Sequence, residues 1–157
     1  MSDSTTYVLV DGENVDATLG TSILGRRPAS EERPRWERLL GFAETTWSQP
    51  ARGLFFLAAN ADLPMAFVQA LLAIGYRVIP LRGSHGEKVV DLAIQRTLEE
   101  IGRRAGDVML VSNDGDFLPQ LRDLVPERRV GVVGFTEFRN QGLTALRQYG
   151  AELFDLE

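Results

Sequence analysis

Short apolar runs alternate along the chain with longer segments in which apolar residues recur at helical spacing. The apolar runs contain few polar positions, which is typical of strands that are buried on both faces of a parallel sheet. They predict strands at residues 7–10, 53–59, 76–81, 107–112 and 129–134, and a last edge strand at 152–154.

The segments between these strands predict helices. Val90, Ile94, Leu98 and Ile101 recur at i, i+4, i+8 and i+11, which is the buried stripe of a helix. Further helices are predicted from Asp62 as N-cap to Gly75 as stop, from Ser30 to Trp47, from Asp116 to Leu124 with Pro119 in the first turn, and from Gln141 to Tyr149. This alternation predicts one α/β domain over residues 1–157, with a central, mostly parallel sheet flanked by helices.

The composition narrows the function classes. The 157 residues contain no cysteine, so disulfides and thiolate metal sites are excluded. A net charge of −5 argues against a large sequence-independent nucleic-acid binder, although a divalent cation can bridge an acidic centre to a nucleic acid. There is neither a signal peptide nor an apolar run of about 18 residues, so we expect a cytoplasmic protein without a membrane partner.

Acidic residues follow two of the predicted strands and open one predicted helix. Asp11 ends the first strand, Asp114 and Asp116 follow the fourth, and Asp91 lies in the first turn of the helix between the third and fourth strands. In parallel sheets, ligands bind beyond the carboxyl ends of strands, where the strand order reverses. If the first and fourth strands are neighbours, these acids converge at one edge of the sheet.

Such a cluster indicates a bound cation. Two close carboxylates repel each other by up to about 4 kcal/mol at about 4 Å when the effective dielectric is near 20. Oxygen ligands without cysteine suit Mg²⁺ or Mn²⁺, which activate water and polarise phosphoryl oxygens. Asn14 and Asn113 are candidates to orient waters or phosphate oxygens. The candidates to meet a phosphate are Lys88, the only lysine, and the arginines Arg77, Arg82, Arg26 and Arg27.

Each acid also has a purely structural explanation. Aspartate is common at strand ends as a turn or cap residue. Asp116 is favoured near a helix N-terminus by the helix dipole. Asp91 has Lys88 three residues before it as an ion-pair partner. It is the joint occurrence of the three acidic segments that favours a metal site over these explanations.

Three segments resemble the NYN domain family, which belongs to the PIN-like nuclease superfamily. They are Val10–Asn14 (VDGEN), Lys88–Asp91 (KVVD) and Val111–Phe117 (VSNDGDF), the last followed by Pro119. Their order and spacing extend the resemblance over essentially the whole chain. It implies a PIN-like three-layer sandwich and metal-dependent cleavage of RNA, with a metal-activated water as the nucleophile.

The resemblance also implies roles for individual residues. The family's acidic positions, which are both catalytic and metal-binding, are matched by Asp11, Asp91, Asp114 and Asp116. The accompanying polar and basic positions are matched by Asn14, Ser112 and Lys88. Together with Asn113, these three residues form the predicted substrate-binding set.

Two features depart from the family pattern. Many members carry a further acid along the same helix, where this chain has Gln95 and Thr97 at the candidate positions. The four remaining acids are compatible with one bound cation. Residues 17–35 form a connection longer than the minimum, either a substrate-contacting flap or a partner surface.

The leading hypothesis is therefore an Mg²⁺- or Mn²⁺-dependent endoribonuclease with RNA as its substrate. The alternative is a catalytically weak or inactive RNA- or protein-binding regulatory module of the same fold, which the acidic net charge favours. A phosphohydrolase acting on DNA or small molecules stays open as well. So does a homodimer, since Phe135, Phe138 and residues 153–156 form either core or interface, with core the favoured interpretation.

Overall fold

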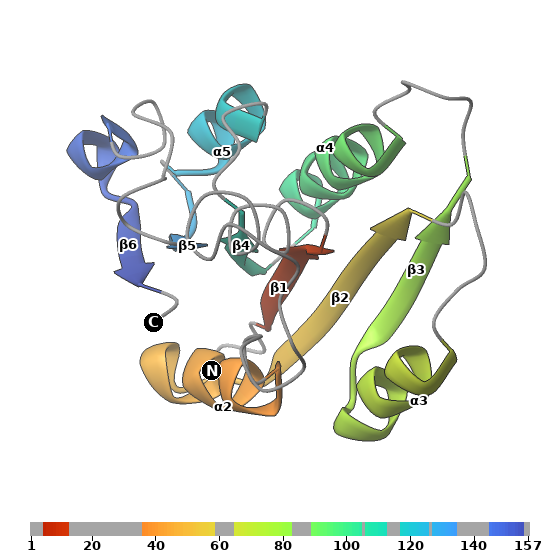
Figure 1. Ribbon diagram of the computed structural model, residues 1–157. Coiled ribbons are helices and arrows are strands. Elements are labelled where there is room, and N and C mark those ends of the chain that lie inside the picture. The colour runs from red at the N-terminus through yellow and green to blue at the C-terminus, as the bar shows by residue number, and fades with distance from the viewer. Residues whose placement is uncertain are drawn as a thin grey trace, which may run out of the picture.

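The computed structural model of the protein describes residues 5–12, 36–58, 65–82, 89–104, 106–112, 117–125, 127–134 and 145–155 (Figure 1). Its strands are β1 (Thr6–Asp11), β2 (Ala51–Ala58), β3 (Arg77–Leu81), β4 (Asp107–Val111), β5 (Val130–Gly134) and β6 (Glu152–Asp155). Its helices are α2 (Trp36–Trp47), α3 (Met65–Ile74), α4 (Val89–Gly102) and α5 (Leu118–Leu124), with the 3₁₀-helix η5 (Leu146–Tyr149). Strands and helices alternate along the chain, which confirms the predicted α/β class.

Neighbouring strands pair in parallel, in the order β3-β2-β1-β4-β5-β6. From β1 the chain builds outward through β2 to β3, and it then returns to the other side of β1, where β4, β5 and β6 follow. Val10 of β1 therefore lies opposite Val111 of β4. The first and fourth strands are neighbours, as the predicted convergence of acids requires. The strand order reverses between them, which is where open parallel sheets bind ligands.

Helices cover both faces of the sheet, α2 and α3 on one and α4, α5 and η5 on the other (Figure 1). Alternation along β1 divides the core between these layers: Val8 and Val10 pack on the α2 side, and Leu9 packs on the α4 side. Phe55 and Phe56 repeat the same division in β2. The predicted three-layer sandwich is confirmed. None of the described helices is both long and apolar enough to cross a membrane.

The end of α3 follows the predicted stop at Gly75. Gly75 has a φ of +119°, a left-handed conformation that glycine adopts without a steric penalty. Its N–H donates to the carbonyls of Leu71 and Leu72, and the N–H of Tyr76 donates to Leu71. The chain then places Tyr76 in the core, where its hydroxyl donates to the carbonyl of Trp36 at 2.8 Å.

The largest difference from the predicted elements lies near the C-terminus. A helix was expected over residues 141–149, and its described part is only the 3₁₀-helix η5. Gly150, at a φ of +102°, ends this turn with its N–H donating to Arg147 and Leu146. Residues 141–144 lie outside the described residues.

The C-terminal strand packs against the core. Leu153 and Phe154 are half-buried, and the ring of Phe154 meets that of Phe42 edge-on with centroids 5.1 Å apart. These contacts support the core interpretation for the two residues. Phe135 and Phe138 lie outside the described residues.

Candidate active site at the carboxyl edge of the sheet

Asp11 is the last residue of β1 and is almost completely buried, with 2% of its surface exposed. It lies two residues after Leu9 and so faces the α4 side of the sheet. The next residue, Gly12, lies very close to β2. A Cβ at this position would lie 2.7 Å from Phe55 Cε1 and 3.1 Å from the carbonyl oxygen of Phe56. A carboxylate in this position is costly unless polar partners or a cation compensate for the lost water.

Ser112 supplies one such partner from the neighbouring strand. It directly follows β4, is fully buried, and donates its N–H to the carbonyl of Val133 at 3.1 Å. Its Oγ donates to Oδ2 of Asp11 at 3.1 Å. This hydrogen bond crosses the point at which the strand order reverses. It holds the Asp11 carboxylate in one orientation at the carboxyl edge of the sheet.

Asp91 approaches the same edge from the helical layer. Helix α4 follows β3 and precedes β4, so it begins at the carboxyl edge of the sheet and ends at the amino edge. Asp91 lies in its first turn and is half-buried. The adjacent Val90 packs in the same core cluster as Leu9 of β1 and Phe56 of β2. The first turn of α4 therefore lies over the strand that carries Asp11.

Gln95 and Thr97, the two candidate positions noted in the sequence, differ in their placement on α4. At 100° per residue, Gln95 follows Asp91 by about one turn and shares its flank of α4, whereas Thr97 lies on another flank. The hydroxyl of Thr97 donates to the carbonyl of Ala93 at 2.8 Å and is thus engaged within the helix. Only Gln95 extends the flank that bears Asp91.

The other predicted site residues lie outside the described residues. They are Asn14, Lys88, Asn113, Asp114 and Asp116. Their roles stay predictions.

The donor chemistry of the described residues fits a hard divalent cation. Asp11 and Asp91 provide carboxylate oxygens, and Ser112 orients one of them. Within the described ranges, no group of three or more histidines and acids is close enough to hold a metal ion. A complete ligand set would therefore need acids beyond these ranges, and Asp114 and Asp116 are the ones that the sequence predicts.

The bond between Ser112 and Asp11 was not foreseen from the sequence. Ser112 was predicted as a substrate-binding residue, and the structure places its side chain in the interior, against a carboxylate. The two residues are 101 positions apart in the chain. Only the parallel pairing of β1 with β4 brings them together. The residue pattern of one strand does not predict which strand will lie beside it. A serine among the apolar residues at a strand end was the one available signal.

Comparison with known proteins agrees with this fold. The model of the NYN domain family matches residues 5–157. A crystal structure of a protein of unknown function from Vibrio parahaemolyticus superimposes with a TM-score of 0.76 at 20% sequence identity, covering 100% of this chain and 96% of the other. That likeness establishes a common fold. A search of curated protein sequences found no significant match.

Proposed function

Because the chain belongs to the NYN domain family, whose members are generally nuclease-like, we propose that it is a metal-dependent endoribonuclease. Its substrate in this proposal is RNA, and its reaction is hydrolysis of a phosphodiester bond. The reaction takes place at the carboxyl edge of the sheet, between β1 and β4.

The buried Asp11 carboxylate is the observation that carries the proposal. An acid at the end of a parallel strand can be a simple turn residue, but such residues are usually solvated. Asp11 is instead 2% exposed and oriented by a buried hydroxyl at the reversal of strand order. A carboxylate is buried in this way where a partner offsets the free-energy cost of removing its charge from water. A divalent cation is such a partner.

In this proposal Asp11, Asp91, Asp114 and Asp116 hold Mg²⁺ or Mn²⁺. The bound cation would lower the pKa of a water molecule and polarise a phosphoryl oxygen. Ser112 keeps the Asp11 carboxylate in the orientation that binding requires, so that no reorganisation is needed when the substrate arrives.

The polar residues of the same segments complete the proposed site. Asn14 and Asn113 orient water or phosphate oxygens without adding charge. Lys88, which precedes Val89 in the sequence, meets a phosphate as a positive charge. No side chain becomes covalently attached to the substrate.

Cleavage of an end-labelled single-stranded RNA in Mg²⁺, Mn²⁺ or EDTA tests the proposal. We compare the wild type with Asp11→Asn and Asp114→Asn, each nearly isosteric and one charge less negative. The control is Asp123→Asn, which makes the same charge change at an exposed position of α5. Circular dichroism and thermal melting check that every variant is folded.

We expect cleavage in Mg²⁺ or Mn²⁺, none in EDTA, and a loss of more than about 100-fold in the two site variants, beyond the usual effect of an outer-shell residue. Asp123→Asn should cleave as the wild type does. Because a ligand that binds only the folded state stabilises it, Mn²⁺ should raise the melting temperature of the wild type and not of Asp11→Asn. Asp11→Asn and Asp114→Asn variants with full activity would refute the site. RNA binding without turnover in any metal would favour the regulatory module of the same fold.

A further inference from the structure

In the described part of the chain, the α4 face of the sheet is open beside β2 and β3. These two strands are connected through the α2–α3 face, so among the described helices only α4 lies near them on the opposite face (Figure 1). Leu54 of β2 and Ile79 and Leu81 of β3 point to this face and remain half-buried. Among the described residues, these apolar side chains are therefore only partly covered beside α4.

The same face contains a pocket of about 420 Å³ between the second half of α4 and strands β1 and β2, toward the amino edge of the sheet. Its apolar wall is formed by Tyr7, Leu54 and Ile101. Its polar wall comes from the last turns of α4 and the residues after it, with Arg96, Glu100 and Arg104. A pocket of this volume accommodates a small organic group, such as one nucleotide.

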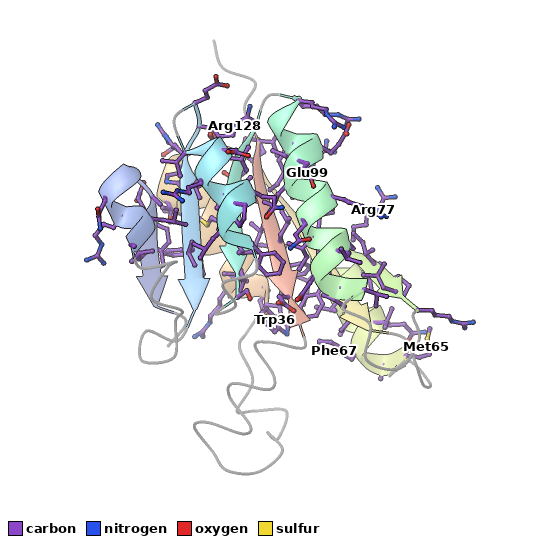
Figure 2. All side chains as sticks on the ribbon, turned by 90° about the horizontal axis from the view of Figure 1, so that it is seen from above. Trp36, Met65, Phe67, Arg77, Glu99 and Arg128 are labelled. Atoms are coloured by element: carbon purple, nitrogen blue, oxygen red, sulfur yellow. The ribbon has the colours of Figure 1, made fainter. Side chains whose placement is uncertain are left out.

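Two further arginines lie on the same face by strand register. Arg52 pairs with Tyr7, and Arg77 pairs with Leu54, so both alternate onto the α4 side, and both are exposed. Figure 2 looks onto this face and labels Arg77 on β3. We call this pocket the arginine groove, taking Arg96 and Arg104 of its lining together with Arg52 and Arg77 on the same face.

The arginine groove is strongly positive in a chain whose net charge is −5. Glu100 is the acid that lines the pocket, and its carboxylate pairs with Arg104 at 3.0 Å and with Arg103 at 3.3 Å. Among the described residues, the pocket lining has two arginines and one glutamate, and Arg52 and Arg77 add two positive charges on the same face, which leaves a surplus of three. Charge of one sign along a cleft with apolar walls concentrates the opposite sign from solution. The ligand that fits is therefore anionic.

We propose that the arginine groove binds single-stranded RNA, with backbone phosphates on the guanidinium groups and one base against the ring of Tyr7. This inference rests on the proposed function, since it takes RNA as the ligand. Guanidinium groups bind phosphate oxygens in pairs and stack on planar rings, and aromatic side chains bind bases without sequence preference. The apolar wall beside the charges favours a nucleotide chain over an acidic peptide, which has no planar apolar group on each residue.

The position of the groove gives it a role distinct from that of the acidic edge. Helix α4 begins at the carboxyl edge with Asp91 and ends at the amino edge beside the pocket. At 1.5 Å per residue, Arg96 lies about 8 Å along the helix axis from Asp91, and the end of the helix lies about 16 Å away. The groove therefore holds RNA that flanks the bond to be cut, and it positions the strand.

Binding of a fluorescein-labelled single-stranded RNA in EDTA, followed by fluorescence anisotropy over a range of salt concentrations, tests the groove without cleavage. The double variant Arg96→Gln/Arg104→Gln removes two charges from it. The matched control Arg38→Gln/Arg103→Gln also removes two exposed charges and also takes one partner from Glu100, but leaves the groove intact. Arg38 lies on α2, on the other face of the sheet.

We expect the groove variant to bind RNA at least about tenfold more weakly, with the slope of log K against log salt smaller by about 1.4, or about 0.7 for each lost phosphate contact. The control should change the dissociation constant by less than about twofold. Equal effects of the two double variants on RNA binding would overturn the proposal. Unchanged RNA binding in the groove variant would overturn it as well. If that variant lost binding to polyglutamate, an acidic peptide, while it kept binding to RNA, the proposal would also be overturned.

A third variant, Tyr7→Leu, keeps an apolar side chain and removes the ring. We expect its dissociation constant to rise about fivefold or more with an unchanged salt slope, because stacking is lost while the phosphate contacts stay. An unchanged dissociation constant in a folded variant would overturn the placement of a base on Tyr7.

The proposals for the groove and for the nuclease can fail separately. If the wild type cleaves RNA while both double variants bind it alike, only the groove fails; if nothing cleaves while the groove variant alone loses binding, only the nuclease fails.

Discussion

The carboxylate of Asp11 accepts a hydrogen bond from Ser112 Oγ at 3.1 Å, and both side chains are buried. Asp11 ends β1 and Ser112 follows β4, so the hydrogen bond joins the two strands between which the strand order reverses. A hydrogen bond to a buried charged group contributes more than one between neutral groups. This pair therefore links the stability of the fold to the orientation of the candidate metal ligand.

Ser112→Ala should lower the free energy of unfolding by about 1–3 kcal/mol, because it leaves a buried carboxylate with one donor fewer. Urea denaturation of the wild type, both single variants and Asp11→Asn/Ser112→Ala gives the coupling between the two side chains. We expect a coupling of at least about 1 kcal/mol. The control pairs Asp11 with Thr46, whose hydroxyl bonds the carbonyl of Phe42 within α2. A coupling for Ser112 no larger than that of the control would contradict the prediction.

Gly53→Ala should destabilise the protein by about 1–3 kcal/mol, because the new methyl group overpacks the core. A Cβ at residue 53 would lie 2.4 Å and 2.5 Å from Cδ1 and Cε1 of Tyr76, which is itself buried. Gly41→Ala is the matched control, since no atom of the described residues outside the helix's own backbone lies within 4 Å of its Cβ position on the exposed side of α2. It should stabilise by about 0.5–1 kcal/mol through helix propensity. Thermal unfolding measures both, and two changes of the same sign would disprove the explanation.

Arg128 should be the arginine whose loss costs most in stability near the amino edge (Figure 2). Its Nη1 donates to the carbonyls of Ile101 at 2.7 Å, Arg104 at 2.8 Å and Gly106 at 3.0 Å, which closes the C-terminal end of α4 with a positive charge. Arg128→Met should lower the free energy of unfolding by about 1.5–3 kcal/mol.

The control for this prediction is Arg103→Gln. Arg103 pairs with Glu100 at 3.3 Å, but 74% of its side chain is exposed, so the change should stay within about 0.5 kcal/mol. Denaturation curves for the two variants are compared under one set of conditions. Similar losses in both would mean that Arg128 contributes only surface charge.

Tyr76 should make the protein sensitive to alkali. Burial raises the pKa of its hydroxyl above the ordinary value of 10.0, and the charge of Glu37 adds to the increase. Above pH 10 the unfolded chain therefore releases this proton while the folded chain keeps it, so the free energy of unfolding falls by up to about 1.4 kcal/mol per pH unit. Below pH 10 the hydroxyl is neutral in both states, and this contribution is fully present.

Tyr76→Phe removes this titration together with the hydrogen bond to Trp36. The variant should be less stable than the wild type at pH 8 by about 0.5–1.5 kcal/mol, and the difference should shrink between pH 10 and pH 11. Urea denaturation at stepped pH values measures it. Parallel stability curves across this range would rule out the assignment to Tyr76.

Much of the fold follows from local patterns. The apolar runs at 7–10 and 107–112 became β1 and β4, and the stripe of Val90, Ile94, Leu98 and Ile101 became the buried face of α4. Gly75 ended α3 as predicted. These features depend on the periodicity of side chains and the conformational freedom of the backbone within a few residues. They can therefore be predicted from the sequence. In its described part, the predicted helix at 141–149 is a 3₁₀ turn that ends at Gly150.

The sequence by itself determined which residues carry charge at the ends of strands, and it narrowed the chemistry to oxygen ligands. Only the tertiary structure decided which of these ends meet. The order of the strands places Ser112 against Asp11, and the register of β2 and β3 beside α4 brings Arg52 and Arg77 to the same face as Arg96. Strand order and register arise from packing between segments that are far apart in the chain, and the period of a single segment carries no record of its neighbours.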